Sequence, residues 1–220
     1  MKIFVIGATG MTGKAIVAEA LNHDLAVIAH ARSNDKLTAL KNEFQSIETL
    51  AKDAFLLTES DFEAADVVID AFSTTPDKAY LQIDLATKLV ALLRESKTRL
   101  AFVLGAGSLL VAGDGNSNEH LAVADIEKDD STLPWRAIPK NQLKELNFLR
   151  DVDNVDWFGI SPGLNFVAGE KSQEILTGTD HLLINDQGVS ETTAGTMAFA
   201  LVAEILKPAH HNARFTVVNA

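Results

Sequence analysis

Cysteine is absent from the sequence, so the protein can form neither a disulfide bond nor a catalytic thiolate. This absence is typical of a reducing compartment, and we expect a cytoplasmic protein. The longest run without a charged side chain, residues 100–113, is 14 residues long and contains three glycines. Such a run is too short to cross a bilayer, and we expect no membrane segment.

Positive charge is also scarce. The chain has 19 lysines and arginines and 30 acidic residues, so its net charge is −11. No basic stripe is present to neutralise a phosphate backbone, which argues against a nucleic-acid partner. The six histidines include no pair with the spacing of metal ligands on one helix face. We therefore expect no metal site, and we interpret His210 and His211 as part of a solvated turn.

The first 15 residues, MKIFVIGATGMTGKA, are the most informative stretch of the chain. The apolar run at residues 3–6 is typical of a strand buried on both faces. It ends at Gly7, and glycines recur at Gly10 and Gly13. Apolar residues then recur on one helix face: Met11, Ala15, Ala18 and Leu21.

A strand, a glycine turn and a helix in this order let the backbone approach a pyrophosphate closely. The first turn of the helix then presents unpaired N–H groups to the phosphates. The spacing is G-x-x-G-x-x-G rather than the commoner G-x-G-x-x-G. We predict a dinucleotide site; the alternative is a tight turn in an unrelated α/β protein.

Apolar runs and helical patterns alternate along the rest of the chain, which indicates an α/β fold. We predict a single Rossmann-type domain over residues 1–220, with a doubly wound, mostly parallel sheet and helices on both faces. Further strands are expected at 25–31, 47–51, 66–71, 100–104, 156–160, 181–184 and 215–218. Helices are expected at 58–64, from Pro76, at 140–150 and after a Ser190 cap.

The interval 111–139, which includes Gly113 and Gly115, is predicted as a helix and a mobile loop over the site. Its acidic residues, such as Asp129, are interpreted as a solvated face. The substrate pocket is assigned largely to residues 105–140 and 161–190.

The residues after the second predicted strand distinguish NAD from NADP. An NAD site places a carboxylate there for the ribose 2′-hydroxyl, whereas this chain has Arg32, Ser33 and Asn34. Arg32 can form a bidentate contact with a 2′-phosphate, and Ser33 can donate a further hydrogen bond. We predict NADP(H) in preference to NAD(H); the alternative is that Arg32 and Lys36 only begin a solvated helix, with Ser33 or Asn34 as its cap.

Ligands of open α/β sheets bind beyond the carboxyl ends of the strands. The residues that follow the third to sixth strands are therefore expected along the cofactor: Asp53, Ala54, Ala71, Phe72, Ser73, Gly105, Pro162 and Gly163. Ser108 is predicted to face the nicotinamide or the substrate. A hydrolase nucleophile is disfavoured, because residues 106–110 read AGSLL rather than G-x-S-x-G.

Together these segments resemble the atypical short-chain dehydrogenase/reductase superfamily, and most closely its small NmrA-like NAD(P)-binding group. That group includes NAD(P)H-flavin reductases and biliverdin reductase B-like proteins. The segments that carry the resemblance are residues 5–13, Arg32, 104–109, 161–163 and 215–217. The resemblance implies that the pyrophosphate is held by Gly7, Thr9, Gly10, Met11 and Thr12, with Arg32 on the adenosine phosphate.

The chain departs from the typical Tyr-x-x-x-Lys pair of short-chain dehydrogenases. Its one tyrosine, Tyr80, lies on a predicted helix and is interpreted as structural. Near the expected place the chain has Lys140-x-x-x-Lys144. Lys140 could donate a proton if desolvation or the neighbouring ammonium lowered its pKa; the alternative is two exposed lysines on one helix face.

We therefore predict an NADPH-dependent oxidoreductase that transfers hydride to a planar small-molecule acceptor such as a flavin, a quinone or a tetrapyrrole-like molecule. Ser108 and Lys140 are its candidate catalytic residues. Flavins and quinones accept hydride without the missing tyrosine. The alternative is a non-catalytic NADP(H)-sensing regulator that binds a protein partner. A nucleotide-sugar epimerase is disfavoured, because it would need the tyrosine pair and a larger C-terminal domain.

Overall fold

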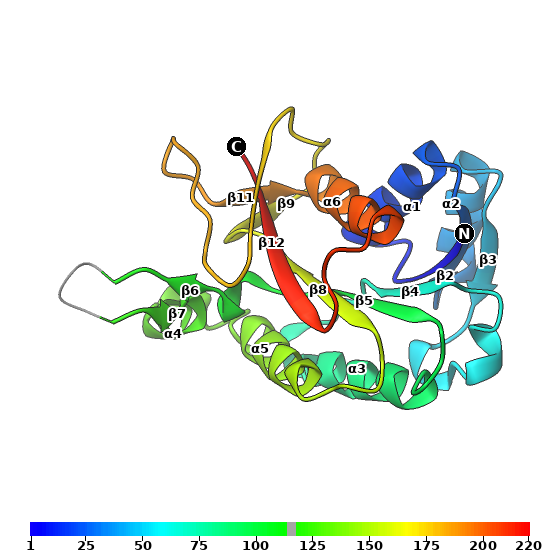
Figure 1. Ribbon diagram of the computed structural model, residues 1–220, viewed down its shortest axis with the longest axis horizontal. Helices are drawn as coiled ribbons and strands as arrows, with labels where there is room; N and C mark the ends of the chain where they lie inside the picture. Colours follow the sequence, from blue (N-terminus) through cyan, green and yellow to red (C-terminus); the bar gives the residue numbers. More distant parts are fainter. Residues whose placement is uncertain (114–117) are drawn as a thin grey trace.

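The computed structural model describes residues 1–113 and 118–220, so Gly115 of the predicted loop lies outside the described residues. Eight strands form one sheet in the order β10-β12-β8-β5-β4-β1-β2-β3 (Figure 1). All neighbours in it are parallel except β10 and β12. The strands are β1 (Lys2–Ile6), β2 (Ala26–Ala31), β3 (Glu48–Ala51), β4 (Val67–Asp70), β5 (Arg99–Val103), β8 (Trp157–Ser161), β10 (Ile175–Gly178) and β12 (Ala213–Asn219). The predicted mostly parallel sheet is confirmed.

Helices cover both faces of the sheet, because its central strands are apolar on both sides. Ile3 and Val5 pack in one core with the helices α1 (Met11–Asn22), α2 (Asn34–Glu43) and α6 (Ala194–Leu206). Phe4 and Ile6 pack in a second core with α3 (Leu81–Leu92) and α5 (Ala137–Arg150). Figure 1 shows these two helical layers above and below the sheet, as the doubly wound prediction requires.

Four short strands form two small sheets apart from the main sheet, and a short helix adjoins one of them. β6 (Leu110–Val111) pairs with β7 (His120–Leu121), and β9 (Asn165–Val167) pairs with β11 (Glu191–Thr193). α4 (Ala122–Lys128) follows β7 directly and lies beside it in Figure 1. Among the described residues, no helix is long and apolar enough to span a bilayer.

The differences from prediction concern short segments. The helix expected at 58–64 is a single 3-10 turn, Glu59–Asp61, and the one expected from Pro76 begins as a 3-10 turn before α3. No strand forms at 181–184, where only a bridge between Leu110 and His181 is present. Ser33 caps α2 as predicted, but α6 is capped by Thr193 instead of Ser190.

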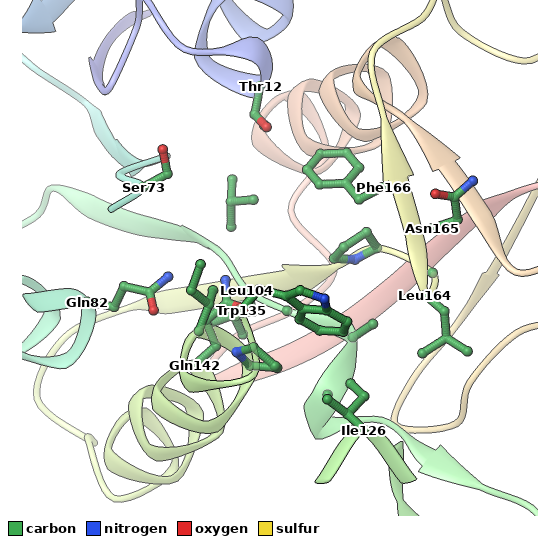
Figure 2. A pocket seen from close by; sticks show the side chains of 18 of the residues that line it. Thr12, Ser73, Gln82, Leu104, Ile126, Trp135, Gln142, Leu164, Asn165 and Phe166 are labelled. Carbon is green, nitrogen blue, oxygen red and sulfur yellow. The ribbon is translucent and has the colours of Figure 1, made fainter. Parts of the chain in front are cut away.

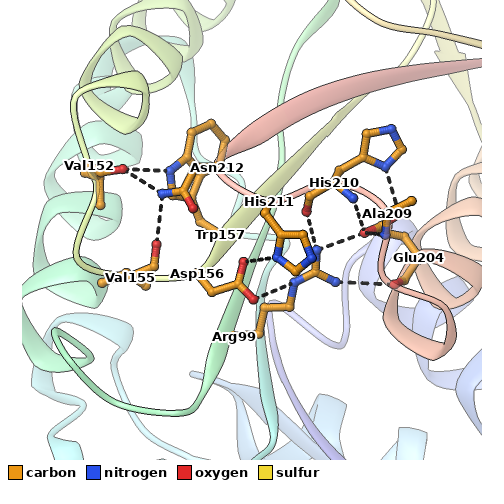
Figure 3. Close-up of polar contacts among 10 residues, drawn as sticks. All are labelled: Arg99, Val152, Val155, Asp156, Trp157, Glu204, Ala209, His210, His211 and Asn212. Carbon is orange, nitrogen blue, oxygen red and sulfur yellow. Dashed lines mark hydrogen bonds and ion pairs between the residues drawn. The ribbon is translucent and has the colours of Figure 1, made fainter.

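A buried polar network lies at the amino-terminal ends of the central strands (Figure 3). Arg99 Nη2 lies 2.8 Å from Glu204 Oε1, which also accepts the backbone N–H groups of Ala209 at 2.9 Å and His210 at 3.0 Å. Burial raises the pKa of Glu204, but these donors outweigh it and hold the pKa below its usual range. The His210 ring stacks on Phe215 with centroids 4.4 Å apart and is 32% exposed, whereas His211 is exposed, so this solvated segment has one half-buried histidine.

Candidate functional site

A cavity with a volume of about 830 Å³ lies beyond the carboxyl ends of the parallel strands (Figure 2). This volume is in the usual range for small-molecule sites. The structure brings nine of the fifteen predicted cofactor residues to its walls: Gly10, Met11, Thr12, Ala71, Phe72, Ser73, Gly105, Pro162 and Gly163. They come from the segments that follow β1, β4, β5 and β8. From the predicted pocket segment 161–190, the lining residues end at Phe166.

The glycine turn after β1 packs tightly against the sheet. Gly7 has φ +76°, and a Cβ at this position would lie 2.5 Å from the carbonyl oxygen of Ala71. A Cβ at Gly13 would lie 2.2 Å from the oxygen of Gly7. Gly10 is the N-cap of α1, and no side chain caps this helix. Because Gly10, Met11 and Thr12 line the cavity, the uncapped N–H groups of this first turn can receive an anion there.

The other predicted cofactor residues lie outside the cavity. Gly7 and the half-buried Thr9 form the turn itself. Arg32 and Ser33 follow β2, and Asp53 and Ala54 follow β3, its neighbour in the sheet. These four residues lie toward the β3 edge of the sheet rather than on the cavity walls.

Arg32 is exposed and forms no ion pair with any described residue. Ser33 Oγ accepts the N–H of Lys36 at 3.3 Å, which leaves its hydroxyl hydrogen available to a ligand. The Asp53 carboxylate instead accepts the backbone N–H of Phe55, two residues later, at 2.9 Å. The segment after β2 therefore presents the Arg32 guanidinium and the Ser33 hydroxyl, with the exposed Lys36 in the next turn of the chain.

Ser108 does not face the cavity, contrary to the orientation predicted from the sequence. Its side chain is only 2% exposed. The hydroxyl donates to the Gly105 oxygen at 3.1 Å and accepts from Arg214 Nη1 at 3.2 Å. Arg214 also donates to Ser161 Oγ at 3.0 Å and forms an ion pair with Asp180. Arg214 of β12 thus holds together the ends of β5 and β8 beneath the site.

We expect Ser108→Ala to lower the free energy of unfolding by about 2 kcal/mol, because the hydroxyl loses one neutral hydrogen bond and one to a charged guanidinium. Because the hydroxyl points away from the cavity, the rate of NADPH oxidation should not change. Urea denaturation and steady-state kinetics measure the two effects. A large fall in turnover with unchanged stability would instead support the predicted catalytic role of Ser108.

The structure does not bring Lys140 to the cavity either. Lys140 and Lys144 are exposed, and Lys140 Nζ lies 2.5 Å from Glu127 Oε1. The cavity is lined instead by Ile138 and Gln142, a pair with the same i, i+4 spacing on α5. Two positions along a helix rotate a side chain by about 200°, so the lysines lie on the opposite face.

Gln142 was not predicted from the sequence as a site residue. The one sequence feature related to it is Gly105, whose missing side chain leaves space for a neighbour. A Cβ at Gly105 would lie 2.1 Å from Gln142 Oε1, so the glycine leaves room for this amide. Trp135 was also missed; it is 45% exposed despite its size. Figure 2 shows Trp135, Leu164 and Phe166 around the cavity, with Thr12 beside Phe166. A planar apolar molecule would pack against this wall.

Two carboxyl groups are buried beneath the cavity, and neither forms an ion pair with a described residue. Asp70 at the end of β4 is 6% exposed, and Glu145 of α5 is 4% exposed. With Gln82 they surround a small void that shares Phe72 and Val103 with the main cavity. Gln82 Oε1 is buried and has no hydrogen-bond partner among the described residues.

Burial raises the pKa of Asp70 to about 7, although the N–H of Phe72 donates to its Oδ1 at 2.9 Å. Burial, and secondarily the charge of Asp70, raise the pKa of Glu145 well above its usual range. Neither pKa shift could be read from the sequence, where Glu145 looks like an ordinary charged residue of a helix.

Comparison with known proteins places this chain among others of the same size. A family model described as NAD(P)H-binding matches residues 7–204. The uncharacterised protein YwnB of Bacillus subtilis is 33% identical over 223 aligned residues, which cover 100% of this chain and 99% of YwnB.

Two solved structures match over the full length of both chains. A protein from Lactobacillus casei is 36% identical with a TM-score of 0.89. A putative NADH-flavin reductase from Streptococcus pneumoniae is 31% identical with a TM-score of 0.87.

Proposed function

The chain belongs to the NAD(P)H-binding family, as its resemblance to NAD(P)-binding reductases predicted, and we propose that it is an NADPH-dependent reductase of a planar small-molecule acceptor. The observation that supports this most strongly is the continuity of the cavity. It runs from the helix N-terminus at Gly10, past the strand ends, to the aromatic wall at Trp135 and Phe166. A dinucleotide and an aromatic acceptor can meet in such a cavity.

The residues present fit a dinucleotide. The uncapped N-terminus of α1 supplies N–H donors for the pyrophosphate, and Gly7 and Gly13 let the turn approach it. Ala71 and Ser73 would border the nicotinamide half, and Gly105 and Gly163 would leave room for the ring. When bound, the cofactor supplies the hydride. The chain's own contribution is to bind, orient and shield the two reactants.

We propose NADP(H) rather than NAD(H) because Arg32 is exposed at the end of β2 without a carboxylate partner among the described residues. Arg32→Ala should weaken NADPH binding by about 10- to 100-fold, since a charge-assisted contact contributes about 1.5–3 kcal/mol. NADH binding should not change. Separate titrations of the two cofactors measure this, with Arg94→Ala, an exposed change just after α3, as the control. Equal losses for NADH and NADPH would contradict the assignment.

The side chains facing the acceptor suit reduction of a flavin or quinone better than alcohol oxidation. Where a dehydrogenase needs an acid and its lysine, the cavity has Ile138 and Gln142. A flavin or quinone accepts hydride without such an acid, because water can supply the proton. The same observation supports the second candidate, a regulator that binds NADP(H) and a protein partner without catalysis.

Oxidation of NADPH by the purified protein with flavins, quinones and a linear tetrapyrrole tests the proposal. We expect saturable oxidation with at least one acceptor. Absence of oxidation above background, in a preparation shown to bind NADPH, would overturn the reductase and favour the regulator. A Gly13→Leu variant, which cannot close the glycine turn, controls for contaminating reductases.

A further inference from the structure

The acceptor end of the cavity carries negative charge and no lining cation. Among the described residues that line the cavity, the ionisable side chains are Asp125 and Asp129, from α4 and the turn after it. A hydrogen bond from Ser131 holds the pKa of Asp129 below its usual range, and bonds from His120 and Lys128 do the same for Asp125. Both carboxylates are therefore charged at neutral pH.

Three basic side chains nearest this end contact acids of the same segment, and a fourth, Arg136, donates its Nη1 to the backbone carbonyl of Glu127 at 3.3 Å. His120 Nε2 and Lys128 Nζ lie 2.6 Å and 3.3 Å from the Asp125 carboxylate. Lys140 pairs with Glu127 at 2.5 Å. Asp129 has no such ion pair among the described residues, and its carboxylate accepts only the Ser131 N–H at 2.9 Å. The charge that a ligand meets here is therefore that of Asp129 above all.

The opposite wall offers hydrogen-bond acceptors as well. Asn165, which lines the cavity, donates its Nδ2 to Glu191 Oε2 at 2.6 Å, so its Oδ1 is left for a ligand. The Thr132 hydroxyl cannot donate to a ligand, because its hydrogen is directed to the Ile126 and Asp129 backbone carbonyls. Apart from the Gln142 amide, which can donate as well as accept, these groups suit a ligand that brings N–H or O–H donors and no anionic group.

We propose that the acceptor is an uncharged planar ring system bearing hydroxyl or N–H donors, and that Asp129, with Asp125, selects against acceptors that carry phosphate or carboxylate. The inference rests on the proposed reductase function and narrows its substrate class. The aromatic wall receives the ring, and the polar substituent meets the carboxylates. An anion placed there would lose hydration without gaining a counter-charge. Riboflavin fits this description, whereas FMN and a carboxylated tetrapyrrole do not.

Riboflavin and FMN test the proposal, because they share the same ring and differ by one phosphate. We expect kcat/KM for NADPH-dependent reduction to be at least about 10-fold higher for riboflavin, and added salt to narrow the ratio. Asp129→Asn should lower the riboflavin preference severalfold while keeping the hydrogen bond from Ser131, since Asn also caps a turn. Asp153→Asn, an exposed change at the other end of the sheet, removes the same charge and should leave the ratio unchanged.

Equilibrium binding of both flavins to the NADP⁺-loaded protein separates this inference from the proposed function. If neither flavin is reduced but riboflavin binds more tightly and Asp129→Asn narrows the difference, the reductase fails and the ligand class stands. If FMN binds or reacts as well as riboflavin, or if riboflavin does not bind, the inference is overturned. An unchanged preference in Asp129→Asn would overturn the role of that carboxylate.

Discussion

Gly10→Asp should weaken NADPH binding by more than about 100-fold and leave the fold intact. Gly10 has φ −79° and ψ 171°, a conformation open to any residue, and the nearest atom to an added Cβ is the Gly7 oxygen at 3.3 Å. An Asp at this N-cap would accept the N–H groups of the first turn and stabilise α1 by a few tenths of a kcal/mol over Gly, and its charge would add about 0.3–1 kcal/mol. It would also occupy the donors that the pyrophosphate needs. Losing two charge-assisted bonds of about 1.5–3 kcal/mol each accounts for the expected loss.

Calorimetric titration with NADPH, together with thermal unfolding, measures both effects. Gly10→Asn is the matched control, because it has the same shape and capping ability without the charge. We expect the Asn variant to bind NADPH more tightly than the Asp variant, with both melting at or above the wild-type temperature. If the Asp variant bound NADPH as well as wild type, the pyrophosphate would not lie at this helix.

Asp70→Asn should change the free energy of unfolding more favourably at pH 8 than at pH 4, by about 4 kcal/mol. The folded-state pKa of Asp70, about 7, is above the unfolded value of roughly 3.9, so the folded protein holds a proton that the unfolded chain releases. Stability that is fully present below about pH 4 is lost as the pH rises toward 7, by about 1.4 kcal/mol per pH unit. Asn does not titrate, and its Oδ1 can still accept the N–H of Phe72.

Urea denaturation of wild type and Asp70→Asn from pH 4 to pH 8 measures the difference directly. The advantage of the variant should grow between pH 4 and pH 7 and then level off. Asp153→Asn, in the exposed loop between α5 and β8, should show no such trend. A constant difference across the range would contradict a buried, titrating Asp70.

The glycine turn could be predicted because its determinants are local. A buried apolar run, Gly7 and a helical period lie within 15 residues, and the backbone alone fixes their geometry. The parallel sheet followed from the alternation of such units. β10 was missed because it is a short edge strand with half-exposed side chains and carries no apolar alternation.

The directions of side chains in the site could not be predicted, because they depend on distant partners. Ser108 turns away from the cavity since Arg214, 106 residues later, holds its hydroxyl. Lys140 was assigned by sequence spacing alone, and an error of two positions on α5 reverses the face of the helix. Trp135 and Asp129 lie in the interval whose pattern resembles a solvated loop, so only the fold shows that they border the cavity.

The most direct measurement is the rate of NADPH oxidation with cofactor deuterated stereospecifically at C4 of the nicotinamide, for each acceptor of the panel. A reductase that orients the ring in this cavity predicts saturable oxidation that is slower for one of the two deuterated stereoisomers and unaffected by the other. Binding of NADPH without oxidation of any acceptor, or equal rates with both labels, would contradict hydride transfer in this site.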